Sequence, residues 1–229
     1  MNPSIRWLVL FDIDGTLIQT GRAGVRGMNA AFERVYGVAR ALDGMPIAGR
    51  TDRGIVADVL RRIGREPSGD AIADLREAYL ADLATEIARP VAAPSGILPG
   101  VSAVLDALEA RDDVRLGLLT GNFQGGARIK LGHFDLWRRF AFGAFGDDHA
   151  DRRPLVEIAV DRSGVRVPCG QVIVIGDTPL DVDCARAYGA RAIGVATGPY
   201  PKAALEGAGA HLVVDTLAET PIAQLLPPR

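Results

Sequence analysis

Phe11-Asp12-Ile13-Asp14-Gly15-Thr16-Leu17 begins at the last residue of an apolar run, 7–11. The composition of this run is typical of a buried β-strand. Side chains two residues apart on an extended chain point to the same side, so Asp12 and Asp14 should lie together at the carboxyl end of this strand. Gly15 allows a sharp backbone turn there. A bare Asp-Gly pair would be interpreted as a solvated turn. The complete heptapeptide directly after an apolar strand instead predicts a ligand site, because open α/β sheets bind ligands at the carboxyl ends of their strands.

Four further runs have the same Val-, Leu- and Ile-rich composition and are bounded by Gly, Asp or polar residues: 115–119, 172–175, 191–195 and 212–214. A run at 140–145 is a weaker strand candidate. Continuous rather than alternating apolar character indicates strands that are covered on both faces. Apolar residues at helical spacing separate the runs, as in the segments 101–108 and 180–188. We therefore expect an α/β fold with a doubly wound, Rossmann-like parallel sheet.

The interval between the first and second runs is much longer than a single crossover helix requires. Three series of apolar residues at helical spacing fill this interval. They are Val25, Met28, Phe32 and Val35; Ile55, Val59 and Ile63; and Ile72, Leu75, Tyr79, Leu83 and Ile87. Stretches with glycine or proline at 15–24 and 90–100 flank the interval and are interpreted as hinges. The sequence therefore predicts an all-helical cap at 17–95, inserted into an α/β core formed by 1–16 and 96–229.

Two more polar motifs follow predicted strands, Leu118-Leu119-Thr120-Gly121-Asn122 and Val174-Ile175-Gly176-Asp177-Thr178-Pro179-Leu180-Asp181. The hydroxyl, backbone N–H and amide of the first suit a phosphoryl oxygen, although a helix N-cap explains Thr-Gly-Asn equally well. The second adds Asp177 and Asp181, and Asp181 could simply be an acidic residue in the first turn of a helix. Four carboxylates at one sheet edge would repel each other strongly without a cation. Oxygen ligands without His or Cys favour Mg²⁺.

These segments resemble motifs I, II and IV of the haloacid dehalogenase-like hydrolase superfamily, and the helical insertion is similar to the small cap of its phosphoglycolate phosphatase-like members. The resemblance implies that Asp12 is the nucleophile that forms an aspartyl-phosphate, and that Asp14 is the general acid and then the base. Thr120 would hold the phosphoryl group. Mg²⁺ would be bound by Asp12, Asp177 and the backbone carbonyl of Asp14, with Asp181 fixing its water shell. The other residues of these motifs expected to contact the substrate are Gly15, Thr16, Gly121 and Asn122.

The sequence departs from the superfamily at motif III, which is usually a lysine followed by proline shortly before motif IV. No lysine lies between Lys130 and Lys202, and Arg152-Arg153-Pro154 occupies the expected place. Lys130 is the favoured candidate for the missing cation, because some branches of the superfamily resemble this chain in supplying the charge from the helix after motif II. Arg152 is the second candidate and Arg153 a further one. A solvated helix face or a charged loop would explain each of them without a catalytic role.

The cap contributes candidate specificity residues. Gly49-Arg50-Thr51-Asp52 resembles the loop that such caps point at the substrate, which makes Arg50 and Thr51 candidate substrate-binding residues. Arg22 and Arg26, near the first hinge, could also contact the leaving group of the substrate.

Composition limits the partners. The 229 residues include 26 Lys and Arg against 28 Asp and Glu, for a formal net charge of -2. This leaves no basic excess for nucleic acid and no polybasic segment for a membrane surface. No stretch approaches the roughly 20 apolar residues of a spanning helix, and two cysteines do not make a disulfide framework. We expect a cytoplasmic monomer or homodimer that acts on a small phosphorylated metabolite, without a nucleic-acid or membrane partner.

The sequence thus predicts a Mg²⁺-dependent phosphatase for a phosphate monoester of the phosphoglycolate or sugar phosphate type. A phosphosugar mutase of the same fold would keep the same aspartates and stays open. A non-enzymatic phosphate-binding or receiver-like protein would also cluster acidic groups at a sheet edge. A receiver lacks the long helical insertion, and the complete set of four carboxylates with Thr120 argues against a silent binding protein.

Overall fold

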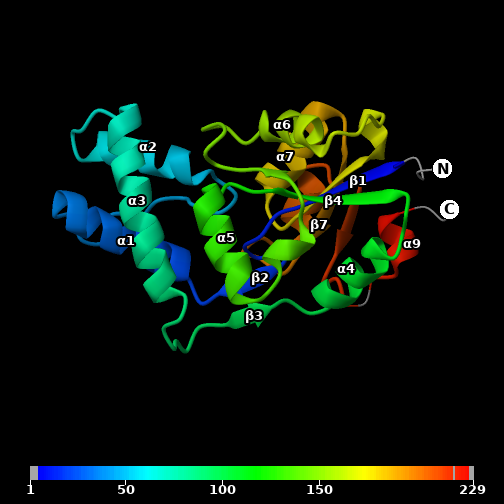
Figure 1. Cartoon of the computed structure of the whole chain (residues 1–229), viewed down its shortest axis with the longest axis horizontal. Coiled ribbons are helices and arrows are strands. Elements are labelled where there is room, and N and C mark those ends of the chain that lie inside the picture. The colour runs from blue at the N-terminus through cyan, green and yellow to red at the C-terminus, as the bar shows by residue number, and fades with distance from the viewer. Residues whose placement is uncertain (1–4, 219, 227–229) are drawn as a thin grey trace.

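A computed structural model describes residues 5–218 and 220–226 of the chain. Within these residues the main sheet has six parallel strands in the order β5-β4-β1-β6-β7-β8 (Figure 1). Their bounds are β1 Trp7–Phe11, β4 Val114–Leu119, β5 Gly143–Ala144, β6 Val172–Gly176, β7 Arg191–Val195 and β8 Leu212–Val214. The chain moves outward from β1 in one direction through β4 and β5, and then in the other through β6, β7 and β8. β1 therefore borders the switch point of the sheet, where doubly wound folds bind their ligands.

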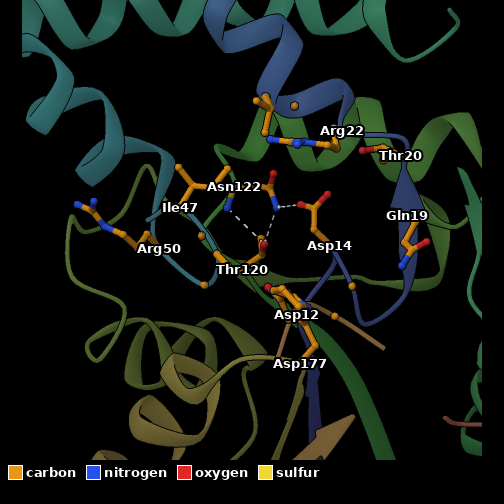
Figure 2. Close-up of a pocket in the computed structure, with 18 of the residues that line it drawn as sticks. Asp12, Asp14, Gln19, Thr20, Arg22, Ile47, Arg50, Thr120, Asn122 and Asp177 are labelled. Carbon is orange, nitrogen blue, oxygen red and sulfur yellow. Dashed lines mark hydrogen bonds between the residues drawn. The ribbon is translucent and has the colours of Figure 1, made fainter. Parts of the chain in front are cut away.

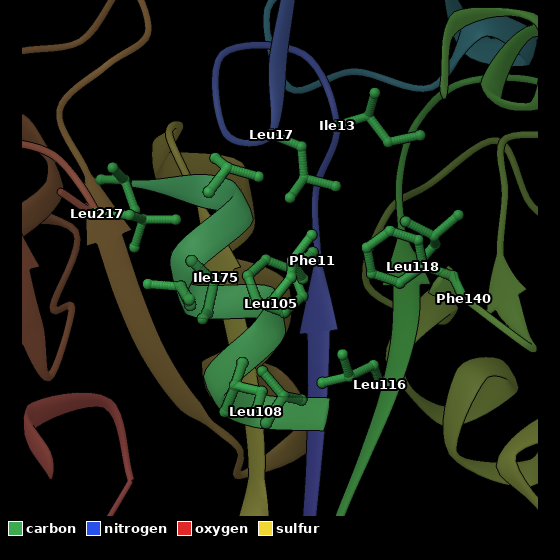
Figure 3. Packing of buried hydrophobic residues seen from close by; sticks show 14 of the residues in the cluster. Phe11, Ile13, Leu17, Leu105, Leu108, Leu116, Leu118, Phe140, Ile175 and Leu217 are labelled. Atoms are coloured by element: carbon green, nitrogen blue, oxygen red, sulfur yellow. The ribbon is translucent and has the colours of Figure 1, made fainter. Parts of the chain in front are cut away.

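Helices cover both faces of this sheet. Their bounds are α4 Val101–Glu109, α5 Gln124–His133, α6 Leu155–Ser163, α7 Pro179–Tyr188, α8 Lys202–Gly207 and α9 Ile222–Leu225, with short 3-10 turns at Trp137–Arg139 and Cys169–Gln171. Val9 and Phe11 of β1 pack into a core with α4 and α5, whereas Leu8 and Leu10 face the opposite core with α6 and α7. Figure 3 shows Leu105 of α4 lying against β1 in the first of these cores. None of the helices in the described residues combines the length and apolarity needed to cross a membrane.

Three helices form the cap: α1 Ala23–Tyr36, α2 Asp52–Arg62 and α3 Gly69–Glu86. They share a separate apolar core, to which Phe123 of the α/β part also contributes. The hydroxyls of Thr51 and Ser68 cap the first turns of α2 and α3 by accepting backbone N–H groups. In Figure 1 the three helices lie beyond the carboxyl ends of the main strands, so the cap covers the edge at which the predicted site residues end.

The predicted all-helical insertion needs one correction. β2 Ile18–Thr20 and β3 Ser95–Ile97 form a small antiparallel sheet, with Ile18 opposite Ile97. Both strands are 3 residues long and fall in the stretches interpreted as hinges; hydrophobic periodicity is not visible over so few residues. The weak strand candidate at 140–145 is a strand only at Gly143–Ala144. The predicted fold class is confirmed, while the boundaries 16/17 and 95/96 stay a prediction.

Candidate active site

The carboxyl ends of β1, β4 and β6 bring the three predicted motifs together. β1 is paired with both neighbours, so that Phe11 lies beside Leu118 and Ile175. Asp12 continues from β1, and its backbone N–H donates to the Ile175 carbonyl at 2.9 Å. Figure 2 shows the side chains of Asp12, Thr120 and Asp177 close together at this edge, with Asp14 and Asn122 just above them. Parallel pairing therefore gathers residues that are more than a hundred positions apart in the sequence.

Arg152 lies against the predicted nucleophile. Its Nη2 donates to Asp12 Oδ1 at 2.7 Å and to the Leu119 carbonyl at 3.1 Å, and also to Asp181 Oδ1. Its Nη1 donates to the carbonyl of Gly49, in the cap loop, at 3.0 Å. The arginine side chain is only 5% exposed. One buried guanidinium thus joins two core carboxylates to the cap.

Lys130 occupies a different part of the site. Its Nζ donates to Asp14 Oδ2 and to Asn122 Oδ1, both at 2.6 Å. The Asn122 amide donates in turn to Asp14 Oδ2 and to the Thr120 hydroxyl, both at 2.8 Å. Lys130 therefore contacts Asp14 rather than Asp12, and it is Arg152 that contacts Asp12. Arg153 lies outside the site, because it pairs with Asp183 at 2.7 Å on the protein surface.

Backbone packed closely around Asp177 leaves little space for other side chains. Thr16 donates its hydroxyl to Asp177 Oδ1 at 3.1 Å. A Cβ atom on Gly15 would lie 2.4 Å from Asp177 Oδ2, and one on Gly198 would lie 1.7 Å from it. Gly15 also has φ +80°, a backbone conformation that favours glycine. Glycine at both positions therefore lets the loops after β1 and β7 close around this carboxylate.

Asp181 lies both in the first turn of α7 and in the acidic cluster, and its predicted part in metal binding stays a prediction. Its Oδ2 accepts the backbone N–H of Thr178 at 3.0 Å and the Thr178 hydroxyl at 2.7 Å, which completes a capping box on α7. Its Oδ1 accepts from Arg152 in the site. The helix cap fixes the carboxylate in an orientation that also serves the acidic cluster.

Asp12, Asp177 and Asp181 form a group that could hold a metal ion. Each offers a carboxylate oxygen, and these oxygens all lie within 4.8 Å of one another. Asp14 turns its carboxylate toward Asn122 and Lys130, so its predicted ligand atom remains the backbone carbonyl. The four predicted carboxylates face two cations, and one divalent ion would balance the remaining charge. The oxygen-only donor set, with the close glycine packing around Asp177, fits a small hard cation.

Burial and mutual repulsion act on the same carboxylates. Burial raises the pKa of Asp12 to about 7, although Arg152 opposes the shift and Asp181 adds to it. Burial also raises the pKa of Asp177 well above its usual range, and the neighbouring Asp12 and Asp181 raise it further. Holding these groups ionised is therefore unfavourable unless a positive charge is close by.

Arg50 and Thr51, the cap residues predicted to bind substrate, both make their polar contacts away from the acidic cluster. Arg50 directs its guanidinium to Asp58 at 2.5 Å, and Figure 2 shows its side chain pointing away from the labelled carboxylates. Thr51 is buried at the start of α2, where its hydroxyl accepts the Gly54 N–H and donates to the Ala150 carbonyl at 2.5 Å. Neither side chain reaches the carboxylates.

The two hinge arginines also differ. Arg26 pairs with Glu86 at the end of α3 at 2.5 Å, so it ties the two ends of the cap together. Arg22 is exposed, has φ 64° and lines the cavity between cap and core. Of these two, only Arg22 is available to a ligand in the cavity.

Asp52 and Thr197 also line the cavity. The sequence placed Asp52 in the cap loop at 49–52 that resembles one pointed at the substrate, and gave Thr197 no role. Asp52 Oδ2 accepts the backbone N–H of Phe123 at 2.8 Å, and its own N–H donates to the Gly121 carbonyl at 2.7 Å. Burial raises the pKa of Asp52 to about 6, against the lowering effect of Lys130. Thr197 donates its hydroxyl to the Gly15 carbonyl at 2.6 Å. Thr197 follows the predicted strand at 191–195, and this position was the sequence signal that could have identified it. The contact of Asp52 with Phe123 has no such signal, because it depends on how the cap and the core meet.

A doubly wound sheet, with an acidic cluster at its switch point and a helical cap over it, defines a capped α/β enzyme. Residues 9–195 match the sequence model of the family described as haloacid dehalogenase-like hydrolase. The chain belongs to this family, which confirms the predicted superfamily and the predicted class of enzyme, a hydrolase.

Similar proteins include one named as a phosphatase and one whose structure was solved with bound phosphate. A phosphoglycolate phosphatase of Rhodospirillum rubrum is 29% identical over 218 residues, which cover 92% of this chain and 87% of that protein. The crystal structure of CbbY from Rhodobacter sphaeroides in complex with phosphate has a TM-score of 0.71 at 22% identity, covering 94% of this chain and 96% of that one. A protein of Bacteroides vulgatus provisionally assigned as a β-phosphoglucomutase has a TM-score of 0.67 at 23% identity, covering 94% and 86%. Because both structures are less than 25% identical to this chain, they are evidence for its fold alone.

The raised pKa of Asp52 predicts a pH-dependent contribution to stability. Its folded pKa of about 6 lies above the unfolded value of about 3.9. The folded state therefore binds the proton of Asp52 more tightly than the unfolded state does. The stabilising contribution of this group is complete below about pH 4 and is lost as the pH rises through 6. Asp52→Asn mimics the protonated form and keeps an oxygen for the Phe123 N–H. The free energy of unfolding in urea of the wild type should fall relative to this variant between pH 4 and 7.

The control for the loss of one negative charge is Asp74→Asn, an exposed position on α3. If the difference in free energy of unfolding between wild type and Asp52→Asn stays constant over this pH range, the raised pKa of Asp52 is wrong.

Proposed function

We propose that the protein is a Mg²⁺-dependent phosphatase that transfers the phosphoryl group of a small phosphate monoester first to Asp12 and then to water. The main support is the position of Asp12: a buried carboxylate at the switch point, held by Arg152 and within the oxygen cluster of Asp177 and Asp181. Membership of the hydrolase family supports the same conclusion.

Asp12 would attack the phosphorus with one carboxylate oxygen while the bond from phosphorus to the leaving alcohol oxygen breaks. Arg152 lowers the charge repulsion between this carboxylate and the phosphate. A Mg²⁺ ion held by Asp12 and Asp177, with Asp181 ordering its water, would supply further charge neutralisation. Thr120 would donate its hydroxyl to a phosphoryl oxygen, and Asn122 orients that hydroxyl by donating an amide N–H to it.

Asp14 would protonate the leaving alkoxide and then remove a proton from the water that releases phosphate from Asp12. Lys130 and Asn122 both donate to its Oδ2. Among the described residues no hydrogen bond is made to Oδ1, so this oxygen is available to carry the proton. Lys130 would then act as a positioning residue for Asp14, and Arg152 rather than Lys130 would supply the motif III cation.

The substrate would be a small phosphorylated metabolite, as the named phosphatase relative suggests, and the protein would act as a monomer or homodimer. The two cysteines are free, which suits a reducing cytoplasm. A phosphosugar mutase would use the same aspartates but return the phosphoryl group to a second sugar hydroxyl. Conversion of a hexose phosphate to its isomer without release of inorganic phosphate would therefore favour the mutase.

The first test measures release of inorganic phosphate from 4-nitrophenyl phosphate with Mg²⁺ and with EDTA. Activity should require Mg²⁺, and Asp12→Asn should lower kcat by at least about 1,000-fold because the nucleophile is lost. Asp183→Asn, on the surface of α7, is the matched control and should retain activity. Activity that persists in EDTA, or an Asp12→Asn enzyme as active as the wild type, would contradict the mechanism.

A second test separates the two buried cations by leaving group. Propyl phosphate needs a proton on its leaving oxygen, whereas 4-nitrophenyl phosphate does not. Because Lys130 acts through Asp14, Lys130→Gln should lower kcat/KM, which reports the steps up to the aspartyl-phosphate, about 100-fold for propyl phosphate and much less for 4-nitrophenyl phosphate. Arg152→Gln should slow both equally.

The control for the second test is Arg153→Gln, which removes an exposed cation from the same loop and should change neither rate. Equal losses of kcat/KM for both substrates in Lys130→Gln would overturn the role given to Lys130.

A further inference from the structure

The cavity between cap and core has two chemically different walls. Its volume is about 630 Å³. The core wall carries the charged and polar groups of the acidic site. The cap wall is formed by apolar side chains from α1, α2 and the loop before α2, together with the ring of Tyr79 from α3, which carries one hydroxyl: Val25, Met28, Leu42, Ile47, Ile55 and Tyr79. In Figure 2 the side chain of Ile47 lies on the cap side of the pocket.

Most polar side chains on the cap side are already engaged. Arg50 pairs with Asp58, and Gln19 donates to the Thr197 carbonyl at 3.3 Å. Asp52 accepts from the Phe123 backbone. Arg22, exposed at the hinge, is the cap-side cation that stays available to a ligand at that end of the cavity. A sugar leaving group, with a hydroxyl on nearly every carbon, would find few free partners along this wall, and unpaired hydroxyls are costly to bury.

The size of the cavity also argues against a small polar leaving group. Cavities of several hundred Å³ enclose molecules much larger than a two-carbon acid. With glycolate as the leaving group, most of the apolar cap wall would stay in contact with water. Packing an apolar group there would instead remove both surfaces from water, which is favourable in proportion to the apolar area buried.

We infer that the leaving group of the preferred substrate carries an apolar body, of the alkyl or aryl alcohol type, that packs against the cap wall beside Val25, Met28 and Ile47. This inference rests on the proposed phosphatase function, because it describes the alcohol that remains after Asp12 takes the phosphoryl group. It distinguishes this site from one shaped for phosphoglycolate or a sugar phosphate.

The test compares kcat/KM for propyl, pentyl and heptyl phosphate with Mg²⁺, alongside phosphoglycolate and glucose 6-phosphate. The basicity of the leaving alkoxide is nearly constant across the alkyl series, so the series isolates the apolar contact. The value of kcat/KM should rise about fourfold for each added methylene, which is 0.8 kcal/mol expressed as a ratio. Heptyl phosphate should exceed both phosphoglycolate and glucose 6-phosphate.

Two valines on α1 offer a matched pair. Val25 lines the cavity, whereas Val35 is 39% exposed and lies outside its lining. Val25→Thr keeps the shape and adds a hydroxyl, so the advantage of heptyl over propyl phosphate should shrink by roughly threefold or more. Ile47→Thr provides a second, partly exposed variant with the same expected loss. Val35→Thr should leave the series unchanged.

The outcomes separate the two proposals. A flat alkyl series, or phosphoglycolate as the best substrate, would overturn the apolar leaving group and leave the phosphatase intact. A full chain-length effect in both Val25→Thr and Ile47→Thr would overturn the assignment to the cap wall. Failure to hydrolyse any of these esters with Mg²⁺ present would overturn the proposed function itself.

Discussion

Repulsion between buried carboxylates is the constraint on which the site depends. Asp12, Asp177 and Asp181 present oxygens within 4.8 Å of one another, and burial raises the pKa of both Asp12 and Asp177. Such a group is stable only with positive charge inside it. Arg152 supplies part of this charge through its contacts with Asp12 and Asp181. The remaining negative charge makes the site receptive to a divalent cation, and beside a cation a carboxylate can approach a phosphate.

The same charge balance couples the cap to the core. Arg152 contacts Asp12, the proposed nucleophile, and, through Nη1, the carbonyl of Gly49 in the cap loop. Asp52 bonds to backbone groups of Phe123 and Gly121 on the core side. These contacts position an apolar wall over a charged floor in one cavity. The floor would bind the phosphoryl group in any member of such a family, whereas the wall would select the alcohol, so chemistry and specificity are carried by different parts of the chain.

The elements and motifs predictable from sequence were those with a local signal. Continuous apolar runs identified β1, β4, β6, β7 and β8, and the polar residues after three of them identified the acidic edge. Features that depend on contacts between distant segments could not be predicted. The pairing of β2 with β3 joins Ile18 to Ile97, and the contact of Arg152 with Asp12 spans 140 positions. The sequence favoured Lys130 over Arg152 as the missing cation, because spacing cannot tell that Arg152 is the one that contacts Asp12.

The most direct measurement of the central claim is the anomalous scattering of Mn²⁺, as a substitute for Mg²⁺, in crystals of the wild-type protein. The account predicts a single strong peak between the carboxylates of Asp12 and Asp177, close to Asp181, and its loss in an Asp177→Asn crystal. A site with no peak at millimolar Mn²⁺, or a peak bound only to carboxylates elsewhere on the surface, would contradict it.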